Sequence, residues 1–246
     1  MADWRILVGR VTLFPALPYD RKASELFRAV WGGEPDSFQT GPSGAIGGAS
    51  VASGSRPPHS LSVSVQPGRV DFNVGARDPS GPPTLDMMLM SKDALFPVLD
   101  GLVERLPDVR SNRAAFFLSL AIRGESVEAA NRVIVAAVDE KYRPPRLTDE
   151  EDFVLQVNTG TASRTQVDVR INVISKFSVE RMQTFVFNPQ AFQGPNSSPI
   201  REDTVSMISI DVNNRASLGP FELHSLRELV REMKELAYSR ANEYLG

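Results

Sequence analysis

The sequence predicts an α+β protein whose antiparallel sheets carry helices on one face, built from two related β-α-β-β-β-α modules. Three observations lead to this prediction. Several short segments alternate apolar and polar residues, as half-buried strands do. Longer segments repeat apolar residues every three or four positions, as amphipathic helices do. The order of these segments in residues 1–107, the first predicted module, returns in residues 108–246, the second.

In the first module, apolar alternation and Gly/Pro breaks define each element. Asp20 stands where an N-cap is expected, and Gly32 and Gly33 follow the first helix. Residues 41–60 are rich in Gly, Ser and Pro, so we expect a flexible loop there. The strands are expected at residues 4–14, 61–66, 69–74 and 85–90, and the helices at 23–31 and 95–106.

The second module carries one extra predicted strand and the longest helix. Ser126 is the expected N-cap of a helix, although the β-branched residues 133–135 leave a strand open there. Residues 139–152, 158–165 and 188–202 read as linker, turn and loop. The strands are expected at 113–122, 153–157, 167–173, 182–187 and 205–212, and the helices at 126–138 and 223–245.

The closing helix has the clearest pattern in the chain. Leu226, Leu229 and Met233 lie on one stripe at helical spacing, while Arg231 and Glu235 lie on the opposite face. Such a stripe needs an apolar partner surface. We therefore expect the helix to pack on the sheet that contains the preceding strand.

Composition bounds the class of protein. The 246 residues are 41% hydrophobic and 23% charged, which is ordinary for a globular protein. No apolar run approaches the roughly 20 residues of a membrane span. Asp3 and Trp4 stand where a signal peptide would carry basic residues before an apolar core. We therefore expect a cytoplasmic location and no membrane partner.

Cysteine is absent and the chain has two histidines, so thiolate chemistry, disulfides and cysteine-ligated metals are excluded. The net charge is −3, with acidic and basic residues spread along the chain. Electrostatic capture of nucleic acid needs a basic surface, which this balance does not indicate.

The end of the chain carries a resemblance to a known group. The apolar strand 208–212 contains Asp211 and leads through a short loop to the long helix, and the strand 170–174 begins with an arginine. This order resembles a sporadically distributed, uncharacterised family of bacterial proteins. The resemblance implies a bacterial cytosolic protein from a mobile or defence-related locus, and it supplies no catalytic residues.

The two histidines are the first candidates for chemistry. His59 stands beside Ser60 as a base would beside a nucleophile, but it lies in the predicted loop and no G-x-S-x-G elbow is present. His224 precedes Glu228 by four residues, the spacing of two metal ligands on a helix, yet no third ligand follows. Surface histidines are the simpler interpretation of both.

Other motifs fail on chemical grounds. The glycines at 41, 44, 47 and 48 lack the lysine of a phosphate loop. Four consecutive acids at 149–152 cannot all face one cation, and the segment that begins at Asp211 lacks the third ligand and the glycine of a calcium loop. We expect linker, solvated loop and strand end, respectively.

One segment favours nucleic acid. Arg113, Phe116 and Phe117 resemble the aromatic strand on which RNA-binding sheets stack bases. The element order and the charge balance do not fit such a domain, so a core position for one of these phenylalanines is the alternative.

The sequence thus assigns no catalytic, cofactor-binding or metal-binding residue and indicates no cofactor. The function it favours is that of a non-catalytic binding or adaptor subunit of a bacterial cytoplasmic protein complex. Its partner would be another protein or a second copy of the chain, docked on a sheet face or edge that the helices leave free. A nucleic-acid-associated module and an enzyme whose carboxylates converge only in the folded state remain alternatives.

Overall fold

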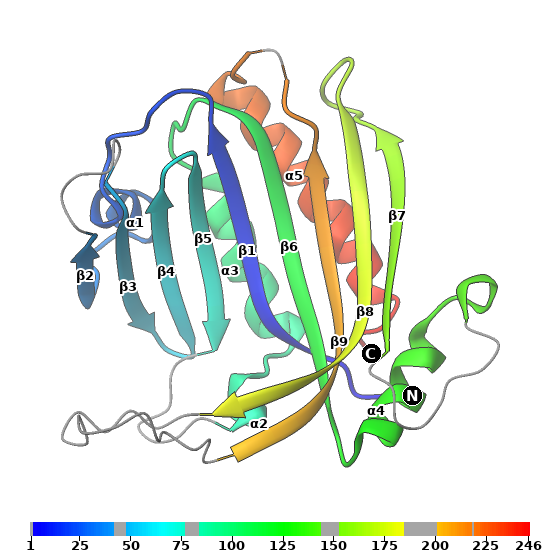
Figure 1. Cartoon of the computed structure of the whole chain (residues 1–246). Helices are drawn as coiled ribbons and strands as arrows, with labels where there is room; N and C mark the ends of the chain where they lie inside the picture. Colours follow the sequence, from blue (N-terminus) through cyan, green and yellow to red (C-terminus); the bar gives the residue numbers. More distant parts are fainter. Residues whose placement is uncertain (1, 42–47, 77–83, 144–152, 185–200, 218) are drawn as a thin grey trace.

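The described strands form one nine-stranded sheet. The computed structural model describes the chain except residues 1, 42–47, 77–83, 144–152, 185–200 and 218 (Figure 1). The strand order is β2-β3-β4-β5-β1-β6-β9-β8-β7, and neighbouring strands are antiparallel throughout. The strands are β1 (Arg5–Pro15), β2 (Ser37–Thr40), β3 (Ser50–Arg56), β4 (His59–Gln66), β5 (Arg69–Ala76), β6 (Ser111–Gly124), β7 (Val154–Ala162), β8 (Arg170–Thr184) and β9 (Arg201–Asn214).

The longer helices lie behind the sheet as it is seen in Figure 1. In the first half, α1 packs on β3 and β4, and α3 packs on β1 and β5. In the second half, α5 packs along β6 and β9, and α4 covers parts of β6, β8 and β9. The helices are α1 (Ala23–Trp31), α2 (Leu85–Met88), α3 (Lys92–Glu104), α4 (Val127–Ala137) and α5 (Leu223–Asn242), with a 3-10 turn η1 (Glu140–Tyr142).

A single core lies between the sheet and these helices. Strand alternation sends Val11 of β1, Phe72 of β5 and Phe116 of β6 to the helix side, where all three are fully buried. Gly9 faces α3 so closely that a Cβ there would lie 2.6 Å from a methyl group of Leu99. The core therefore continues across the central β1–β6 pair.

The α+β class and the antiparallel sheet are confirmed, and the longer helices lie on one face of it, while the short α2 lies against the other. The order of strands reads alike from the centre outwards, as β1, β5, β4, β3 in one half and β6, β9, β8, β7 in the other. The predicted element count is not met, because the described chain has nine strands and five α-helices, with β2 and β3 as additions in the first half and α2 in place of a predicted strand. The predicted module boundary at 107/108 falls between α3 and β6.

The prediction of a flexible loop over residues 41–60 is wrong where the chain is described. Ser50–Arg56 forms β3 and His59 begins β4, while residues 42–47 lie outside the described part. Small side chains make this possible because they allow α1 to approach the sheet. A Cβ on Gly54 would lie 2.7 Å from the ring of Phe27, and the Ser50 hydroxyl accepts a hydrogen bond from the Ala23 N–H at 3.0 Å.

Two further expectations for the first half are corrected. Residues 85–90 are not a strand: they form the short helix α2, after which Met90 makes a single bridge to Ile6. Lys22, not Asp20, occupies the N-cap of α1. The helix end at Gly32 and the hairpin turn at Gly68 are confirmed, and both glycines adopt positive φ.

In the second half the turn and the strand boundaries were misplaced. The predicted turn 158–165 is largely the end of β7, and the true turn includes Val167, which is 90% exposed, and Asp168 at φ 62°. The two strands predicted at 167–173 and 182–187 belong to one strand, β8, as far as the chain is described. The helix after Ser126 is confirmed, and the Ser126 hydroxyl accepts from the Ala129 N–H at 3.1 Å.

Polar contacts fix α5 beside α3. Arg231 binds both carboxylate oxygens of Glu104 at 2.9 Å, and Lys234 lies 2.7 Å from Asp100 Oδ1. Tyr238 stacks on Phe96 with ring centroids 3.7 Å apart. Burial, reinforced by the nearby Asp100 carboxylate, raises the pKa of the Tyr238 hydroxyl. Within the described residues, no helix is long and apolar enough to cross a membrane.

The buried stripe of α5 should dominate its contribution to stability. Leu229 is fully buried, so Leu229→Ala should lower the free energy of unfolding by about 2 to 5 kcal/mol. Arg231→Ala removes a partly exposed ion pair and should cost no more than about 1 kcal/mol. Urea titration of both variants measures the difference. Equal, small losses would mean that α5 is not docked on the sheet.

Candidate functional site

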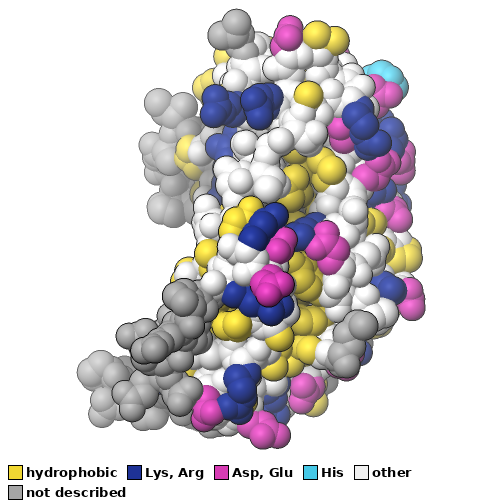
Figure 2. Space-filling model, turned by 90° about the vertical axis from the view of Figure 1, so that its right-hand side faces the viewer, with side chains coloured by type: hydrophobic (Ala, Val, Ile, Leu, Met, Phe, Trp, Pro, Cys, Tyr) yellow, Lys and Arg dark blue, Asp and Glu magenta, His cyan; other side chains and the backbone are white. Residues whose placement is uncertain are grey.

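The face of the sheet opposite the longer helices is the candidate functional site. In profile the molecule is concave along this side, on the left of Figure 2. On β4, the side chains facing this surface are Ser60, Ser62, Ser64 and Gln66, because their neighbours Leu61, Val63 and Val65 point into the core. We call this surface the open face. It presents a polar lining over a rigid sheet.

Two arginine–phenylalanine stacks lie at the centre of the open face. The Arg10 guanidinium lies 4.7 Å from the centroid of the Phe117 ring, and the Arg113 guanidinium lies 4.7 Å from that of Phe14. In the β1–β6 register Arg10 is opposite Phe117 and Phe14 is opposite Arg113. Each strand therefore contributes an arginine and, four residues later, a phenylalanine, which makes the four residues nearly two-fold symmetric. We refer to them as the Arg/Phe quartet.

A buried carboxylate fixes one side of the quartet. Asp71 on β5 accepts a hydrogen bond from the Thr12 hydroxyl at 2.6 Å, and its Oδ2 lies 2.7 Å from Nε of Arg69. Arg10 Nε lies 3.9 Å from the same carboxylate. The nearby Asp71 carboxylate restricts the rotamers of Arg10, so this side chain is oriented before a binding partner arrives.

Amide side chains flank the quartet. Asn213 on β9 donates to Asp211 at 3.0 Å, and Asn172 on β8 donates to Asn213 at 3.3 Å. On the other side, Asn73 donates to Ser62 at 3.3 Å. Asn213 is buried, and Asn73 and Asn172 are half-buried.

One end of the open face is closed by α2. Leu85 of α2 is buried with Ala121 and Val205, which belong to β6 and β9. Nearby, Asp203 is buried and lies 2.9 Å from Arg123 and 2.8 Å from Arg201. This second apolar cluster and its ion pairs limit the accessible open face to the centre and the other end of the sheet.

Among the described residues, neither histidine belongs to a nucleophile–base pair or to a metal-binding group. His59 is buried, with its Nε2 2.9 Å from the carbonyl oxygen of Ala94. Strand alternation places Ser60 on the opposite side of the sheet. His224 is 84% exposed and lies 3.4 Å from Glu228. In the described chain, no group of three His, Cys, Asp or Glu side chains could hold a metal ion.

The remaining sequence candidates are resolved in part. The acidic run 149–152 and the glycines at 44 and 47 lie outside the described residues. Asp211 is a residue of β9 on the open face. In the segment that resembled an aromatic RNA-binding strand, Phe116 lies in the core, whereas Phe117 lies on the open face beneath Arg10.

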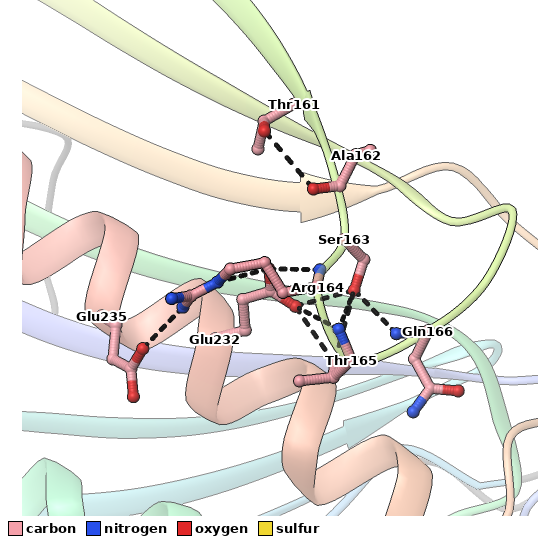
Figure 3. A network of polar contacts seen from close by, with 8 residues as sticks. All are labelled: Thr161, Ala162, Ser163, Arg164, Thr165, Gln166, Glu232 and Glu235. Atoms are coloured by element: carbon pink, nitrogen blue, oxygen red, sulfur yellow. Dashed lines mark hydrogen bonds and ion pairs between the residues drawn. The ribbon is translucent and has the colours of Figure 1, made fainter.

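A second polar network fastens the β7–β8 turn to α5 (Figure 3). The buried carboxylate of Glu232 accepts hydrogen bonds from the Ser163 hydroxyl at 2.7 Å and from the Arg164 backbone N–H at 2.8 Å. The Thr165 hydroxyl donates to it at 3.0 Å. Glu235 accepts a hydrogen bond from the Arg164 guanidinium at 2.7 Å. The network is a structural clamp, since both carboxylate oxygens of Glu232 accept hydrogen bonds from the β7–β8 turn.

These hydrogen bonds determine the charge state of Glu232. Burial by itself raises the pKa of the carboxyl, but the donors from Arg164, Ser163 and Thr165 outweigh burial and hold the pKa below its usual value.

Sequence reasoning missed Arg10 and Phe14. The available signal was the spacing Arg-x-x-x-Phe, which occurs both at Arg10–Phe14 and at Arg113–Phe117. With strand alternation, this spacing places both residues of each pair on one face, but only the antiparallel register brings the two pairs together.

Comparison with known protein families, curated proteins and solved structures gave no match to this chain.

Glu232→Gln should destabilise the protein at neutral pH by about 1 to 3 kcal/mol, because a buried acceptor network loses its charge. The folded-state pKa is depressed below 4.5, so this stabilisation is complete above the unfolded-state pKa and disappears as pH falls through the folded-state value. Urea titrations from pH 7 to pH 3 should show the two proteins converging in acid. The exposed Glu235→Gln is the matched control and should change little at any pH; a constant deficit for Glu232→Gln would contradict the charge argument.

Proposed function

We propose that this chain is a non-catalytic binding or adaptor subunit of a bacterial cytoplasmic protein complex, and that it docks a partner protein on the open face. The observation that carries the proposal is the Arg/Phe quartet at the centre of a concave, polar surface. The proposal extends to two related modules that meet at the β1–β6 pair, which would account for the two-fold arrangement of the quartet. A role in a defence-related locus rests on the family resemblance alone.

The quartet has the chemistry of an interface anchor. Arginine and aromatic residues dominate the binding energy of protein interfaces, and stacking on a ring leaves the N–H edge of a guanidinium available for a bidentate contact. The Nε atoms of Arg10 and Arg113 are buried and donate no hydrogen bond within the described structure, so a partner would bind the terminal N–H groups of each guanidinium. A partner that presents carboxylate side chains fits this arrangement best.

The surrounding charge favours protein over nucleic acid. Asp71 and Asp211 stand among the arginines of the open face, and the chain as a whole carries a net charge of −3. Phosphate backbones select surfaces with a clear excess of Lys and Arg. The mixed signs of this face instead suit a protein surface with complementary charges.

Single-stranded nucleic acid is the second candidate, and one observation favours it. Arg113 and Phe117 share the open face of β6, where bases could stack on the exposed planes. A labelled 20-nucleotide single strand, tested by fluorescence anisotropy at two salt concentrations, addresses this candidate directly.

The Arg10 side chain provides the sharpest test of the docking surface. Arg10→Ala and Arg10→Lys should each reduce capture of a partner protein in pull-downs by at least about tenfold, equal to 1.4 kcal/mol, since both lose the planar guanidinium. Quantitative mass spectrometry of the bound fraction measures the change. The exposed Arg28, which pairs with Glu34 on the helix side, supplies the control Arg28→Ala, for which capture should stay within twofold.

The same experiment separates the two candidates. A protein partner should remain bound after nuclease treatment, whereas binding that disappears with nuclease, together with salt-sensitive binding of the oligonucleotide, would move nucleic acid to first place. Equal capture by wild type and Arg10→Ala, with both proteins folded by thermal unfolding, would remove the open face as the docking surface.

A further inference from the structure

The strand β7 forms one edge of the sheet, and its outer side pairs with no strand in the described part of the chain. Residues 154–162 pair with β8 in an unbroken antiparallel register, and no described residue pairs with their other side. Backbone N–H and C=O groups therefore point outward along this edge. Such an edge is a template for another strand.

The usual protections of an edge strand are missing from β7. Its sequence, VLQVNTGTA, contains no charged residue and no proline, and its register with β8 contains no bulge. The opposite edge of the sheet is protected by brevity, because β2 has only four residues. Natural edges normally carry a charge, a proline or a bulge to prevent pairing, so an edge without them indicates that pairing takes place there.

Apolar side chains lie partly exposed along the free edge of β7. Val154 is 62% exposed, and Leu155 and Val157 are half-buried. Beside them, β7 and α5 enclose a groove of ≈ 290 Å³ whose lining includes Val157, Tyr142 and Leu236. A neighbouring hollow of ≈ 400 Å³ shares Leu236 and Ser239 with it. Figure 2 looks towards this side and shows hydrophobic side chains along a furrow near the middle of the view.

We propose that the edge pairs with the β7 strand of a second copy of this chain, antiparallel across a two-fold axis near Asn158. The absence of charge favours this occupant, because a two-fold axis places the residue at the strand centre opposite its own counterpart, and a charge there would repel itself. The Asn158 amide both donates and accepts hydrogen bonds, so it can face its counterpart without an unpaired atom. In this register Val154 of each copy lies opposite Ala162 of the other, which covers its exposed side chain.

The two-fold pair would be a reversible dimer. Stable interfaces bury about 800 Å² on each partner, and a single nine-residue strand pair with its flanking side chains provides less than that. Dimerisation should therefore depend on protein concentration. The open face lies on a different side of the molecule from the β7 edge, so its partner and the second copy can bind at the same time.

Light scattering coupled to size exclusion tests the pairing. Wild type should move from the 27.0 kDa of one chain towards twice that mass as the concentration rises. Asn158→Lys places two like charges opposite each other and should weaken dimerisation by at least about tenfold. The control Gln39→Lys puts the same charge on the exposed strand β2 at the opposite edge and should leave the dimer intact.

The lack of cysteine makes a second test specific. Single cysteines at positions 156, 158 and 160, which share one side of β7, can form disulfides only between copies. Because position 158 faces its own counterpart in this register, Asn158→Cys should give a covalent dimer under mild oxidation, whereas Gln156→Cys, Gly160→Cys and Gln39→Cys should not. A single-chain mass at every concentration would overturn the proposal and leave the edge to a strand from a different protein. A dimer that persists in Asn158→Lys and forms no β7 disulfide would place the contact elsewhere and overturn it equally.

Discussion

The pairing of β1 with β6 is the interaction on which the rest of this structure depends. It joins two strands about a hundred residues apart in the chain and makes one sheet from the two halves. The helix side of this pair contributes Val11 and Phe116 to the common core, and the other side carries the Arg/Phe quartet. One backbone register thus fixes both the continuity of the core and the centre of the proposed docking surface. A slip by one residue would exchange the two sides, because side chains alternate with period two.

The long helix α5 contacts different parts of the protein with its apolar and its polar side chains. Its apolar stripe packs on the sheet, while its polar side chains reach in two directions, to α3 through Arg231 and Lys234 and to the β7–β8 turn through Glu232 and Glu235. The helix therefore positions both the sheet and the start of β8. Among the described residues, no helix packs on β7 as α5 packs on β6 and β9, and a groove lies between β7 and α5.

Much of the fold was predictable because, in most segments, the spacing of apolar residues agrees with the turn and capping residues at the ends of the element. The hairpin around Gly68 and the helix after Ser126 followed from alternation, a turn glycine and an N-cap. Where prediction failed, a tertiary contact outweighed composition. The Gly/Ser-rich stretch forms β3 because only small residues fit beneath Phe27 of α1. Val167 and Val169 alternate as strand residues do, but they lie in and beside a turn whose backbone donates hydrogen bonds to Glu232. The site was less predictable, since Arg10 and Phe117 meet only through a register that no local pattern encodes.

The order of strands has a consequence for synthesis. Of the described strands β1 is made first, yet it occupies the centre of the finished sheet, with β5 on one side and β6 on the other. A nascent chain that has reached only α3 can assemble β1 to β5 with their helices, but one flank of β1 has no strand beside it until β6 leaves the ribosome. That side of β1 stays exposed until then, because β6 has to be synthesised before it can pair with β1. The ribosome-bound first half is therefore the stage at which this chain is most open to misassembly with its neighbours on a polysome.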